Sequence, residues 1–511
     1  MVYTDTMIHN MRREYIGCNI KEKIRIAVMF QVASYWPSIE SFYEACVSDQ
    51  GIDIKIYFVG DLSVEKAQIK DTVEFLYKHK ISFEKYTERA ISEFRPHIAL
   101  FQPPYDTLYR NPSALSKHLM NMGTRIIYIP YGIEIADTED AHLAHFHTYV
   151  VKNSWRIYTF SDLMKEDYYK YCPNRHAVRV TGSPKFDAIG NRDILMDESI
   201  RKKANGRRII LWKMHFPKMI YEGTERRQVT PYLSEYLKFA NKLREFADLF
   251  FVVMPHPMFF SQTIAEELAE EAKKLLFILE MQPNAVIDLS QDYRNSLYNA
   301  DAIMIDRSAL MVEAGACNVP VFFMRNSDYE EPFTKAVKTL VDTYVQGCTS
   351  DDMVEFVLKF RIDGFKDCVG KQKKAFAEVV PYFDGQCGKR IVEDLKCGMK
   401  EETDRRTKVV FFGASRTCEH YLKSLNILNN SNYNVLAVSD NSSGKWGKRC
   451  EGVEIIPPTK IVDLDFDVLV ISAEQFHMPI KHKLVYELFI DEEKIVRLDD
   501  FCEQYLYGVE Y

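Results

Sequence analysis

The sequence predicts an α/β protein with two Rossmann-like halves and a small third Rossmann-like domain at its C-terminal end. Short apolar runs, typical of strands buried on both faces of a parallel sheet, recur along the chain. Stretches with helical apolar spacing separate these runs, as βαβ units require. The 511 residues are too many for one hydrophobic core, so these strands and helices must divide into several domains.

The first half is predicted at residues 21–200, after a polar tail at residues 1–20. A helix with apolar spacing is expected at 38–48. The expected strands are the runs at 24–30, 54–59, 98–101, 125–129, 155–160 and 178–181. Their alternation with helical stretches predicts a doubly wound sheet.

The second half is predicted at residues 201–399 and repeats this pattern. Its expected strands are 208–212, 250–254, 302–305 and 319–324, and a helical run is expected at 351–383. Two Rossmann-like halves in series are typical of the GT-B architecture of glycosyl and related transferases. The active site is then expected in the cleft between the halves.

A charged run at 400–408 predicts a linker, and residues 409–511 are predicted to form the small Rossmann-like domain. Its expected strands are 409–413, 435–440 and 468–472. Gly413 takes the first position of a G-x-G-x-x-G fingerprint, and Asp440 ends the second strand, where an acidic residue can meet a ribose. The other two glycines are absent, so the ligand of this domain stays open.

Composition excludes several classes of protein. A net charge of −7 argues against a nucleic-acid partner, which normally requires a basic surface. The eleven cysteines are scattered without a C-x-x-C pair, which argues against a zinc ribbon or a disulfide scaffold and predicts a reducing cytoplasm. No apolar leader and no run long enough to cross a bilayer is found, so we expect a cytoplasmic protein.

Two expected strands of the second half end in polar residues. The strand at 250–254 runs into Pro255-His256-Pro257, and the strand at 302–305 runs into Asp306. Ligands of open α/β sheets bind at the carboxyl ends of the strands. A histidine between two prolines sits on a stiff turn and can donate to a pyrophosphate oxygen. The pattern predicts a pocket for a nucleotide diphosphate.

The residues after Asp306 extend this prediction. Ser308 is expected to cap a helix whose first amides can bind phosphate. Arg307 can pair with phosphate through two parallel hydrogen bonds. Glu313, near the next helical turn, can accept from a ribose hydroxyl. Taken alone, a strand joined to a capped helix is common in α/β folds, so this motif is a weak signal.

Two segments of the first half also carry candidate residues. In the segment 182–187, Gly182 permits close backbone approach and Lys185 can reach a phosphate, although a hinge between the halves fits equally well. The stretch 131–147 combines Tyr131 with four acidic residues and three histidines: Glu134, Asp137, Glu139, Asp140, His142, His145 and His147. Its spacing matches no helix face well. We therefore favour one catalytic acid or base over a dedicated metal site.

These residues together resemble one family. The motifs are Gly182-Ser183-Pro184-Lys185-x-Asp187, Met254-Pro255-His256-Pro257, Asp292-Tyr293 and Asp306-Arg307-Ser308-Ala309-x-x-x-Glu313. Over residues 90–360 the chain resembles the CDP-glycerol glycerophosphotransferases of teichoic acid and capsule synthesis. The resemblance implies a GT-B fold and transfer of glycerol or ribitol phosphate from a CDP-linked donor to a hydroxyl of a lipid-linked or polymeric acceptor, with release of CMP. It also implies peripheral attachment to the inner membrane face.

The resemblance assigns roles to particular residues. His256 is expected on the diphosphate of CDP-glycerol, with Asp306, Ser308 and Glu313 as nucleotide and phosphate contacts. The full set of expected donor contacts is Gly182, Lys185, Pro255, His256, Asp306, Arg307, Ser308 and Glu313.

Two departures from the family pattern leave parts of the reaction open. The histidine of the family's Trp-His-Gly segment, its proposed base, corresponds here to Tyr131, so the expected bases are Glu134, Asp137 and Tyr131, in that order. The family's Asp-Tyr-Ser-Ser is Asp-Arg-Ser-Ala here, which allows a different donor head group. Two alternatives therefore remain: a GT-B glycosyltransferase or epimerase that uses a UDP-sugar, and a non-catalytic assembly partner. A requirement for a divalent metal stays open.

Overall fold

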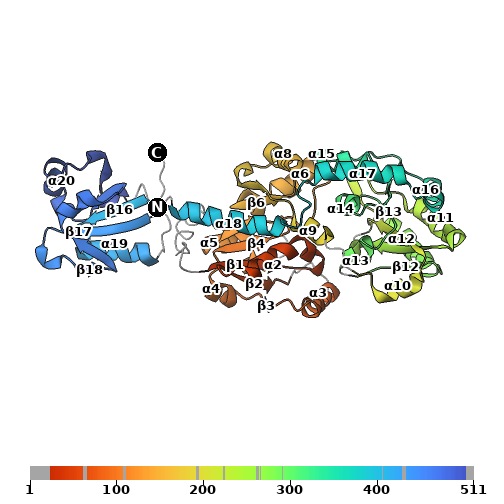
Figure 1. The fold of residues 1–511 in the computed structure, drawn as a ribbon, viewed down its shortest axis with the longest axis horizontal. Helices are drawn as coiled ribbons and strands as arrows, with labels where there is room; N and C mark the ends of the chain where they lie inside the picture. Colours follow the sequence, from red (N-terminus) through yellow and green to blue (C-terminus); the bar gives the residue numbers. More distant parts are fainter. Residues whose placement is uncertain are drawn as a thin grey trace.

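Three sheets, each with the strand order of a doubly wound fold, form the protein in the computed structural model (Figure 1). The structure describes residues 23–60, 66–106, 111–190, 195–222, 225–260, 264, 266–290, 292–404, 407–427 and 433–501. The predicted polar tail at 1–20 and residues 405–406 of the predicted linker lie outside these ranges.

The first sheet has seven parallel strands in the order β3-β2-β1-β4-β5-β6-β7. The strands are β1 (Ile24–Phe30), β2 (Ile52–Phe58), β3 (Phe83–Lys85), β4 (Ile98–Phe101), β5 (Arg125–Tyr128), β6 (Arg156–Thr159) and β7 (Val178–Val180). The helices are η1 (Ala33–Ser38), α2 (Glu40–Ser48), α3 (Lys66–Lys78), α4 (Glu88–Phe94), η2 (Pro112–Ala114), α5 (Ser116–Asn121), α6 (Glu139–Phe146), α7 (Tyr149–Lys152), α8 (Asp162–Tyr171), η3 (Arg175–Ala177), α9 (Pro184–Gly190) and α10 (Glu198–Ala204).

The second sheet has six parallel strands in the order β12-β11-β8-β13-β14-β15. The strands are β8 (Arg208–Met214), β11 (Leu249–Pro255), β12 (Ala285–Ile287), β13 (Ala302–Ile305), β14 (Val321–Met324) and β15 (Val345–Gly347), with an antiparallel hairpin of β9 (Met219–Glu222) and β10 (Glu225–Gln228). The helices are α11 (Leu233–Lys242), η4 (Leu243–Phe246), η5 (Pro257–Phe260), α12 (Glu266–Glu280), α13 (Arg294–Leu297), α14 (Leu310–Ala316), α15 (Lys335–Val341), α16 (Ser350–Asp363), α17 (Lys366–Val379) and α18 (Cys387–Asp404).

The third sheet has the order β18-β19-β17-β16-β20-β21. Its strands are β16 (Thr407–Phe412), β17 (Tyr433–Ser439), β18 (Arg449–Cys450), β19 (Val453–Ile456), β20 (Val468–Ile471) and β21 (Ile495–Arg497), of which β18 is antiparallel to β19. The helices are α19 (Arg416–Ile427), η6 (Ser443–Lys445), η7 (Pro458–Asp463), η8 (Glu474–Phe476), α20 (His477–Tyr486), η9 (Glu492–Lys494) and α21 (Leu498–Phe501).

The apolar runs became central strands because both faces of each sheet are covered. All seven residues of β11 are buried, as expected for a parallel strand with helices on either side. The strand order reverses between β1 and β4, between β8 and β13, and between β16 and β20. Such switch points are where open α/β sheets bind ligands.

The predicted helical run at 351–383 is two helices rather than one. Helix α16 ends at Gly364, whose φ of +69° places it in the left-handed region, and α17 starts at Lys366. Glycine adopts this conformation without the steric penalty of a Cβ and commonly ends helices.

Helix α18 connects the second sheet to the third and packs on the first half against α2 (Figure 1). An ideal Cβ on Gly388 would lie 2.3 Å from the backbone C and O of Ser41, so only glycine fits this approach. Asp394 of α18 accepts from Tyr158 at 2.8 Å and from Arg156 at 3.2 Å. The predicted boundary at residue 399 falls inside this helix, and the division into domains stays a prediction.

Candidate functional site

The switch point of the second sheet brings together the residues that follow three adjacent strands. The backbone N–H of His256, after β11, donates to the carbonyl of Met214 at the end of β8 at 2.8 Å. The backbone N–H of His215, after β8, donates to both carboxylate oxygens of Asp306, after β13, at 2.8 and 2.9 Å. The predicted residues His256 and Asp306 are therefore linked through the backbone of Met214 and His215, which the sequence analysis did not single out.

The two histidine rings are neighbours and both are held in the neutral form. Their centroids lie 4.9 Å apart, with the planes tilted by 37°. Burial, with the nearby Lys213, lowers the pKa of His256 to about 3. Burial also lowers the pKa of His215 to about 2, and His256, Arg307 and Lys213 add to the effect. At neutral pH each ring therefore has one N–H and one nitrogen lone pair.

Lys213 gives the site a buried cation that the sequence analysis missed. It is the penultimate residue of β8 and only 7% exposed. Burial lowers its pKa to about 8, while the carboxylates of Asp306 and Asp288 favour the charged form. Lys213 is therefore mostly charged at neutral pH. The available signal was a lysine within the otherwise apolar run at 209–214.

The structure places Asp306, Arg307 and Ser308 in structural contacts. Asp306 is fully buried, and its carboxylate accepts from the hydroxyl of Tyr236 at 2.8 Å as well as from His215. Burial raises the pKa of Asp306 to about 6. The Nε–H of Arg307 donates to both carboxylate oxygens of Glu331 at 2.6 Å. In this arrangement the carboxylate of Asp306 holds the backbone of His215 in position.

Ser308 is not the N-cap of the following helix, contrary to our expectation. Helix α14 begins at Leu310, so Ala309 holds the N-cap position and makes no side-chain cap. The hydroxyl of Ser308 accepts from the backbone N–H of Leu310 at 3.3 Å, so its side chain still bonds an amide at the start of this segment. Ala309 itself has helical φ and ψ.

A second group of predicted residues meets across the two halves. The ammonium of Lys185 in α9 lies 2.5 Å from Glu313 Oε1 in α14, and both side chains are buried. The same ammonium donates to the carbonyl of Tyr131 at 3.3 Å, and the hydroxyl of Tyr293 lies 3.4 Å from Glu313 Oε1. Glu313 Oε2 is buried and has no hydrogen-bond partner among the described residues. Lys185 is therefore held by a carboxylate in this structure.

Gly182 and Pro255 have structural surroundings. Gly182 has a φ of +79°, and an ideal Cβ there would lie 2.4 Å from the Sγ of Cys387 and 2.8 Å from the Cβ of Tyr382. The glycine thus allows the loop before α18 to pack closely. Pro255 is the last residue of β11 and pairs with Met214 of β8, so it fixes the start of the turn that carries His256.

The three expected bases all lie on a loop that touches the second half. The backbone N–H of Asp137 donates to the carbonyl of Pro332 at 2.7 Å, and the Thr334 hydroxyl donates to the carbonyl of Glu134 at 3.0 Å. Gly132 lies beside Ala309, since an ideal Cβ on it would be 3.9 Å from the Ala309 Cβ. This loop therefore lies where the first half contacts the second.

The Tyr131 hydroxyl is already engaged. It lies 2.5 Å from the hydroxyl of Tyr105, and its ring stacks on Tyr35 with centroids 4.2 Å apart. Burial raises the pKa of Tyr131 well above its usual value, and the neighbouring Tyr105 adds to this. A phenol in this environment stays protonated at neutral pH and is unsuited to take up a proton.

The two carboxylates of this loop also have partners. Asp137 accepts from the hydroxyl of Tyr171 and from the Nε2 of His142, both at 2.7 Å. The hydrogen bond from Tyr171 is the main reason why the pKa of Asp137 is lowered, which weakens it as a base. Glu134 Oε1 lies 2.6 Å from the Nδ1 of His145, a close ionic contact whose angle does not make a hydrogen bond.

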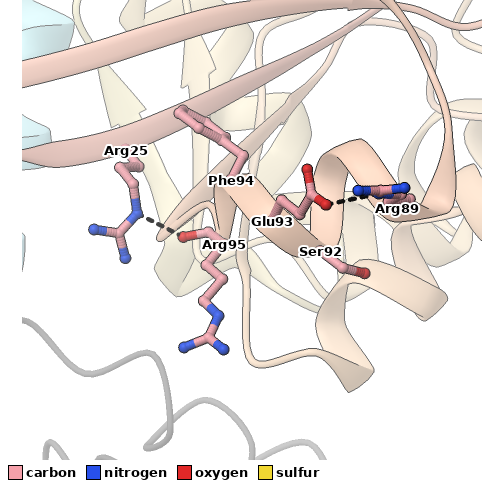
Figure 2. A pocket seen from close by; sticks show the side chains of 6 residues that line it. All are labelled: Arg25, Arg89, Ser92, Glu93, Phe94 and Arg95. Atoms are coloured by element: carbon pink, nitrogen blue, oxygen red, sulfur yellow. Dashed lines mark hydrogen bonds and ion pairs between the residues drawn. The ribbon is translucent and has the colours of Figure 1, made fainter.

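Two other features lie away from this site. A hollow of about 630 Å³ is lined by Arg25, Arg89 and Arg95, among others, and Figure 2 shows these side chains. The Arg25 Nε–H donates to the Arg95 carbonyl at 2.8 Å. These residues lie where β1 and β4 begin, at the amino edge of the first sheet. The hollow is therefore at the edge of the first sheet opposite to the loop 131–137, which follows β5 and contacts the second half.

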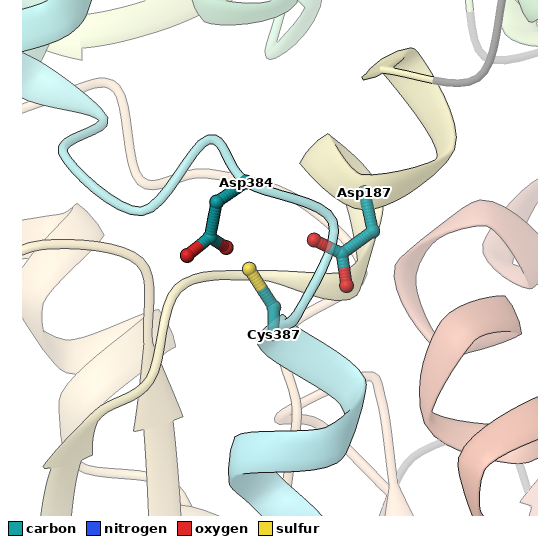
Figure 3. A group of neighbouring side chains, drawn as sticks. All are labelled: Asp187, Asp384 and Cys387. Atoms are coloured by element: carbon teal, nitrogen blue, oxygen red, sulfur yellow. The ribbon is translucent and has the colours of Figure 1, made fainter.

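Asp187, Asp384 and Cys387 form a group whose ligand-type atoms lie within 4.8 Å of one another (Figure 3). Asp187 accepts from the Ser41 hydroxyl at 2.7 Å and from the backbone N–H of Gly388 at 3.1 Å. Asp384 pairs with Arg390, and burial raises the pKa of the Cys387 thiol. These contacts join α2, α9 and α18, which makes the group part of the packing of the first half.

In the third domain, Asp440 ends β17 as expected, but its carboxylate is used within the domain. It accepts from the backbone N–H groups of Ala414 and Ser442, each at 2.8 Å, and from the ammonium of Lys445 at 2.9 Å. Gly413, with a φ of +105°, makes the turn after β16.

Comparison with known proteins supports the fold. The family model described as C2185-like, N-terminal, matches residues 405–496, which is the small C-terminal domain. No curated protein matches the chain. Among the described residues, none of the helices combines the length and the apolar character that crossing a bilayer takes.

Several solved structures share the arrangement of the first two sheets. The S. aureus MnaA–UDP co-structure is 15% identical, covers 74% of this chain and 97% of its own, and has a TM-score of 0.51. The UDP-GlcNAc 2-epimerase from Neisseria meningitidis bound to UDP-GlcNAc is 12% identical, covers 73% of this chain and 100% of its own, and has a TM-score of 0.50. The wall teichoic acid polymerase TagF, 12% identical over 77% of this chain and 95% of its own, scores 0.48, too low to add to this comparison. The chain therefore has two Rossmann-like halves in the GT-B arrangement, followed by a small Rossmann-like domain.

Proposed function

We propose that the protein transfers glycerol phosphate, or a related polyol phosphate, from a CDP-linked donor to a hydroxyl of an acceptor and releases CMP. The observation that carries the proposal is the convergence of Lys213, His215 and His256 at the carboxyl ends of adjacent parallel strands. The choice of CDP-glycerol is supported by the motif resemblance around His256 and Asp306.

This cluster suits a diphosphate in both charge and hydrogen bonding. Lys213 is a buried cation without a hydrogen bond or ion pair to the described residues, so a bound anion would complete its environment. His256 presents an N–H donor on a turn fixed by two prolines. Donors preorganised around a transferring phosphoryl group stabilise the charge that develops in the transition state.

The acceptor would enter from the first half, whose loop at 131–137 faces the second half at 332–334. A lipid-linked or polymeric acceptor, and work at the inner face of the membrane, are supported by the family resemblance. Deprotonation by Glu134, Asp137 or Tyr131 is the assignment that the sequence favours.

A second candidate keeps the fold and changes the donor to a UDP-sugar, which makes the protein a glycosyltransferase or epimerase. The observation that favours it is the likeness in fold to the UDP-GlcNAc 2-epimerase described above. The departure of Arg307 and Ala309 from the family pattern is compatible with this alternative.

Thermal-shift titrations with CDP-glycerol, CDP-ribitol and UDP-GlcNAc, each followed by an assay for released nucleotide, separate these functions. A ligand at about 100 times its Kd stabilises the folded state by about 2.7 kcal/mol. We expect a CDP-polyol to raise the melting temperature and to yield CMP. Stabilisation by UDP-GlcNAc alone would contradict the proposal. Binding of CDP-glycerol without turnover on any acceptor tested would favour a non-catalytic assembly role.

A further inference from the structure

The two neighbouring histidines at the switch point have opposite tautomers. The Nδ1 of His215 lies 2.8 Å from the carbonyl oxygen of Phe216. A carbonyl can only accept, so this Nδ1 carries the hydrogen and Nε2 keeps a lone pair. The Nδ1 of His256 accepts from the backbone N–H of Met258 at 3.1 Å. Here Nδ1 holds the lone pair and Nε2 carries the hydrogen.

The fold therefore sets a proton acceptor beside a hydrogen-bond donor. Both Nε2 atoms lack a hydrogen-bond partner among the described residues, and the ring centroids are 4.9 Å apart. Each tautomer is fixed by a backbone group one or two residues after the histidine, so the arrangement does not depend on other side chains. If His215 served only to donate a hydrogen bond to the diphosphate, it would need a hydrogen on Nε2, as His256 has.

We propose that His215 is the catalytic residue that takes the proton from the acceptor hydroxyl, while His256 donates to the diphosphate. This inference rests on the proposed transfer and replaces the base assignment of the sequence. Each of the three predicted bases already contacts another side chain. Tyr131 contacts Tyr105, Asp137 contacts Tyr171 and His142, and Glu134 contacts His145.

The charges around His215 explain why it acts only after the donor binds. The groups that face it are Lys213 on β8, His256 after β11, and Asp306 and Arg307 after β13. Lys213 and Arg307 disfavour a second proton on the ring. A bound diphosphate adds negative charge at the same place, which raises the pKa of His215 toward the neutral range. His215 therefore becomes an effective base in the donor complex.

In the proposed step, the acceptor hydroxyl oxygen attacks the β-phosphorus of CDP-glycerol. The new P–O bond forms as the bond between this phosphorus and the bridging oxygen breaks, and that oxygen leaves with CMP. The hydroxyl proton passes to His215 Nε2 and then to solvent. The negative charge on the departing CMP meets the Nε2–H of His256 and the ammonium of Lys213.

The variant His215→Asn tests this role because its amide can still donate to the Phe216 carbonyl but has no basic nitrogen. We expect CDP-glycerol to bind within about threefold of wild type by calorimetry, and kcat for CMP release to fall by about 100-fold or more. The wild-type kcat should decrease at acidic pH as His215 becomes protonated in the complex. The kcat of the variant should not show this decrease. His482→Asn, on an exposed helix of the third domain, is the matched control and should keep wild-type kcat.

A kcat for His215→Asn within about threefold of wild type would overturn the role of His215 and leave the transfer reaction intact. Absence of CMP release by wild type with CDP-glycerol and CDP-ribitol would instead overturn the proposed function, and the catalytic role with it. Nitrogen NMR of the wild-type imidazoles checks the tautomers independently of activity and of the fold of any variant. A protonated Nε2 on neutral His215 would contradict the proposal.

Discussion

Burial decides the protonation of the side chains at the switch point. His256 and His215 are kept neutral because their charged forms would lose hydration, whereas Lys213 keeps its charge beside the carboxylates of Asp306 and Asp288. Burial also favours the neutral form of Asp306, which for a carboxyl group means a pKa raised to about 6. One cation, two neutral rings and a buried carboxyl thus lie together at the strand ends, where the low dielectric of a largely buried site favours binding of a compact anion.

Replacing Tyr131 tests whether its hydroxyl has a chemical role. We expect Tyr131→Phe to keep kcat for CMP release within about threefold, because the hydroxyl is already bonded to Tyr105 and burial raises its pKa. Tyr131→Ala also removes the ring stacked on Tyr35 and should lower the melting temperature. A loss of about 100-fold in Tyr131→Phe, with donor binding unchanged, would mean that the hydroxyl takes part in proton transfer.

Single residues of the site differed in how well they could be predicted. His256 was recognisable because its two flanking prolines and the preceding strand mark a strand end. Lys213 and His215 were missed because nothing in the sequence says that β8 lies between β11 and β13. Their importance follows from strand order, which depends on pairing between distant segments.

At the scale of elements, the packing of α18 on α2 holds the long helix against the first half. The contact depends on Gly388, since a Cβ there would lie 2.3 Å from the backbone of Ser41. Most of the partners of this helix belong to the first half, including Arg156 and Tyr158. The helix therefore ties the end of the second half back to the first.

We expect Gly388→Ala to destabilise the protein by about 1–3 kcal/mol, because the methyl group forces α18 away from α2. Gly370→Ala is the matched control in α17, where a Cβ would meet nothing within 4 Å. The control should stabilise the protein by about 0.5–1 kcal/mol, since alanine favours a helix over glycine. Melting temperatures that change in the same direction for both variants would contradict this account of the contact.

The elements that sequence patterns predicted best were apolar central strands. The expected runs at 24–30 and 302–305 coincide with β1 and β13. The short edge strands β3, β12 and β15 were missed because their residues are only partly buried and lack an apolar pattern. The helical run at 351–383 kept its apolar spacing through Gly364, so its break was not anticipated.

At the scale of the whole molecule, buried ion pairs join the two halves. Lys185 of the first half meets Glu313 of the second, and Glu40 at the start of α2 meets Arg294 in α13. Removing one partner of a buried pair leaves an uncompensated charge and costs about 3–5 kcal/mol. These contacts set the distance between the halves and hence the space open to a donor.

The central claim is that Lys213 and His256, beside His215, bind the diphosphate of a CDP-polyol donor. Calorimetric titration of CDP-glycerol into wild type, His256→Ala and His256→Gln tests it most directly. Wild type should bind, and His256→Ala should bind at least about tenfold more weakly, because a hydrogen bond to a charged group contributes about 1.5–3 kcal/mol. His256→Gln, which restores an N–H donor near the Nε2 position, should recover part of the loss. Equal affinity in wild type and His256→Ala, or no binding of CDP-glycerol by wild type, would contradict the claim.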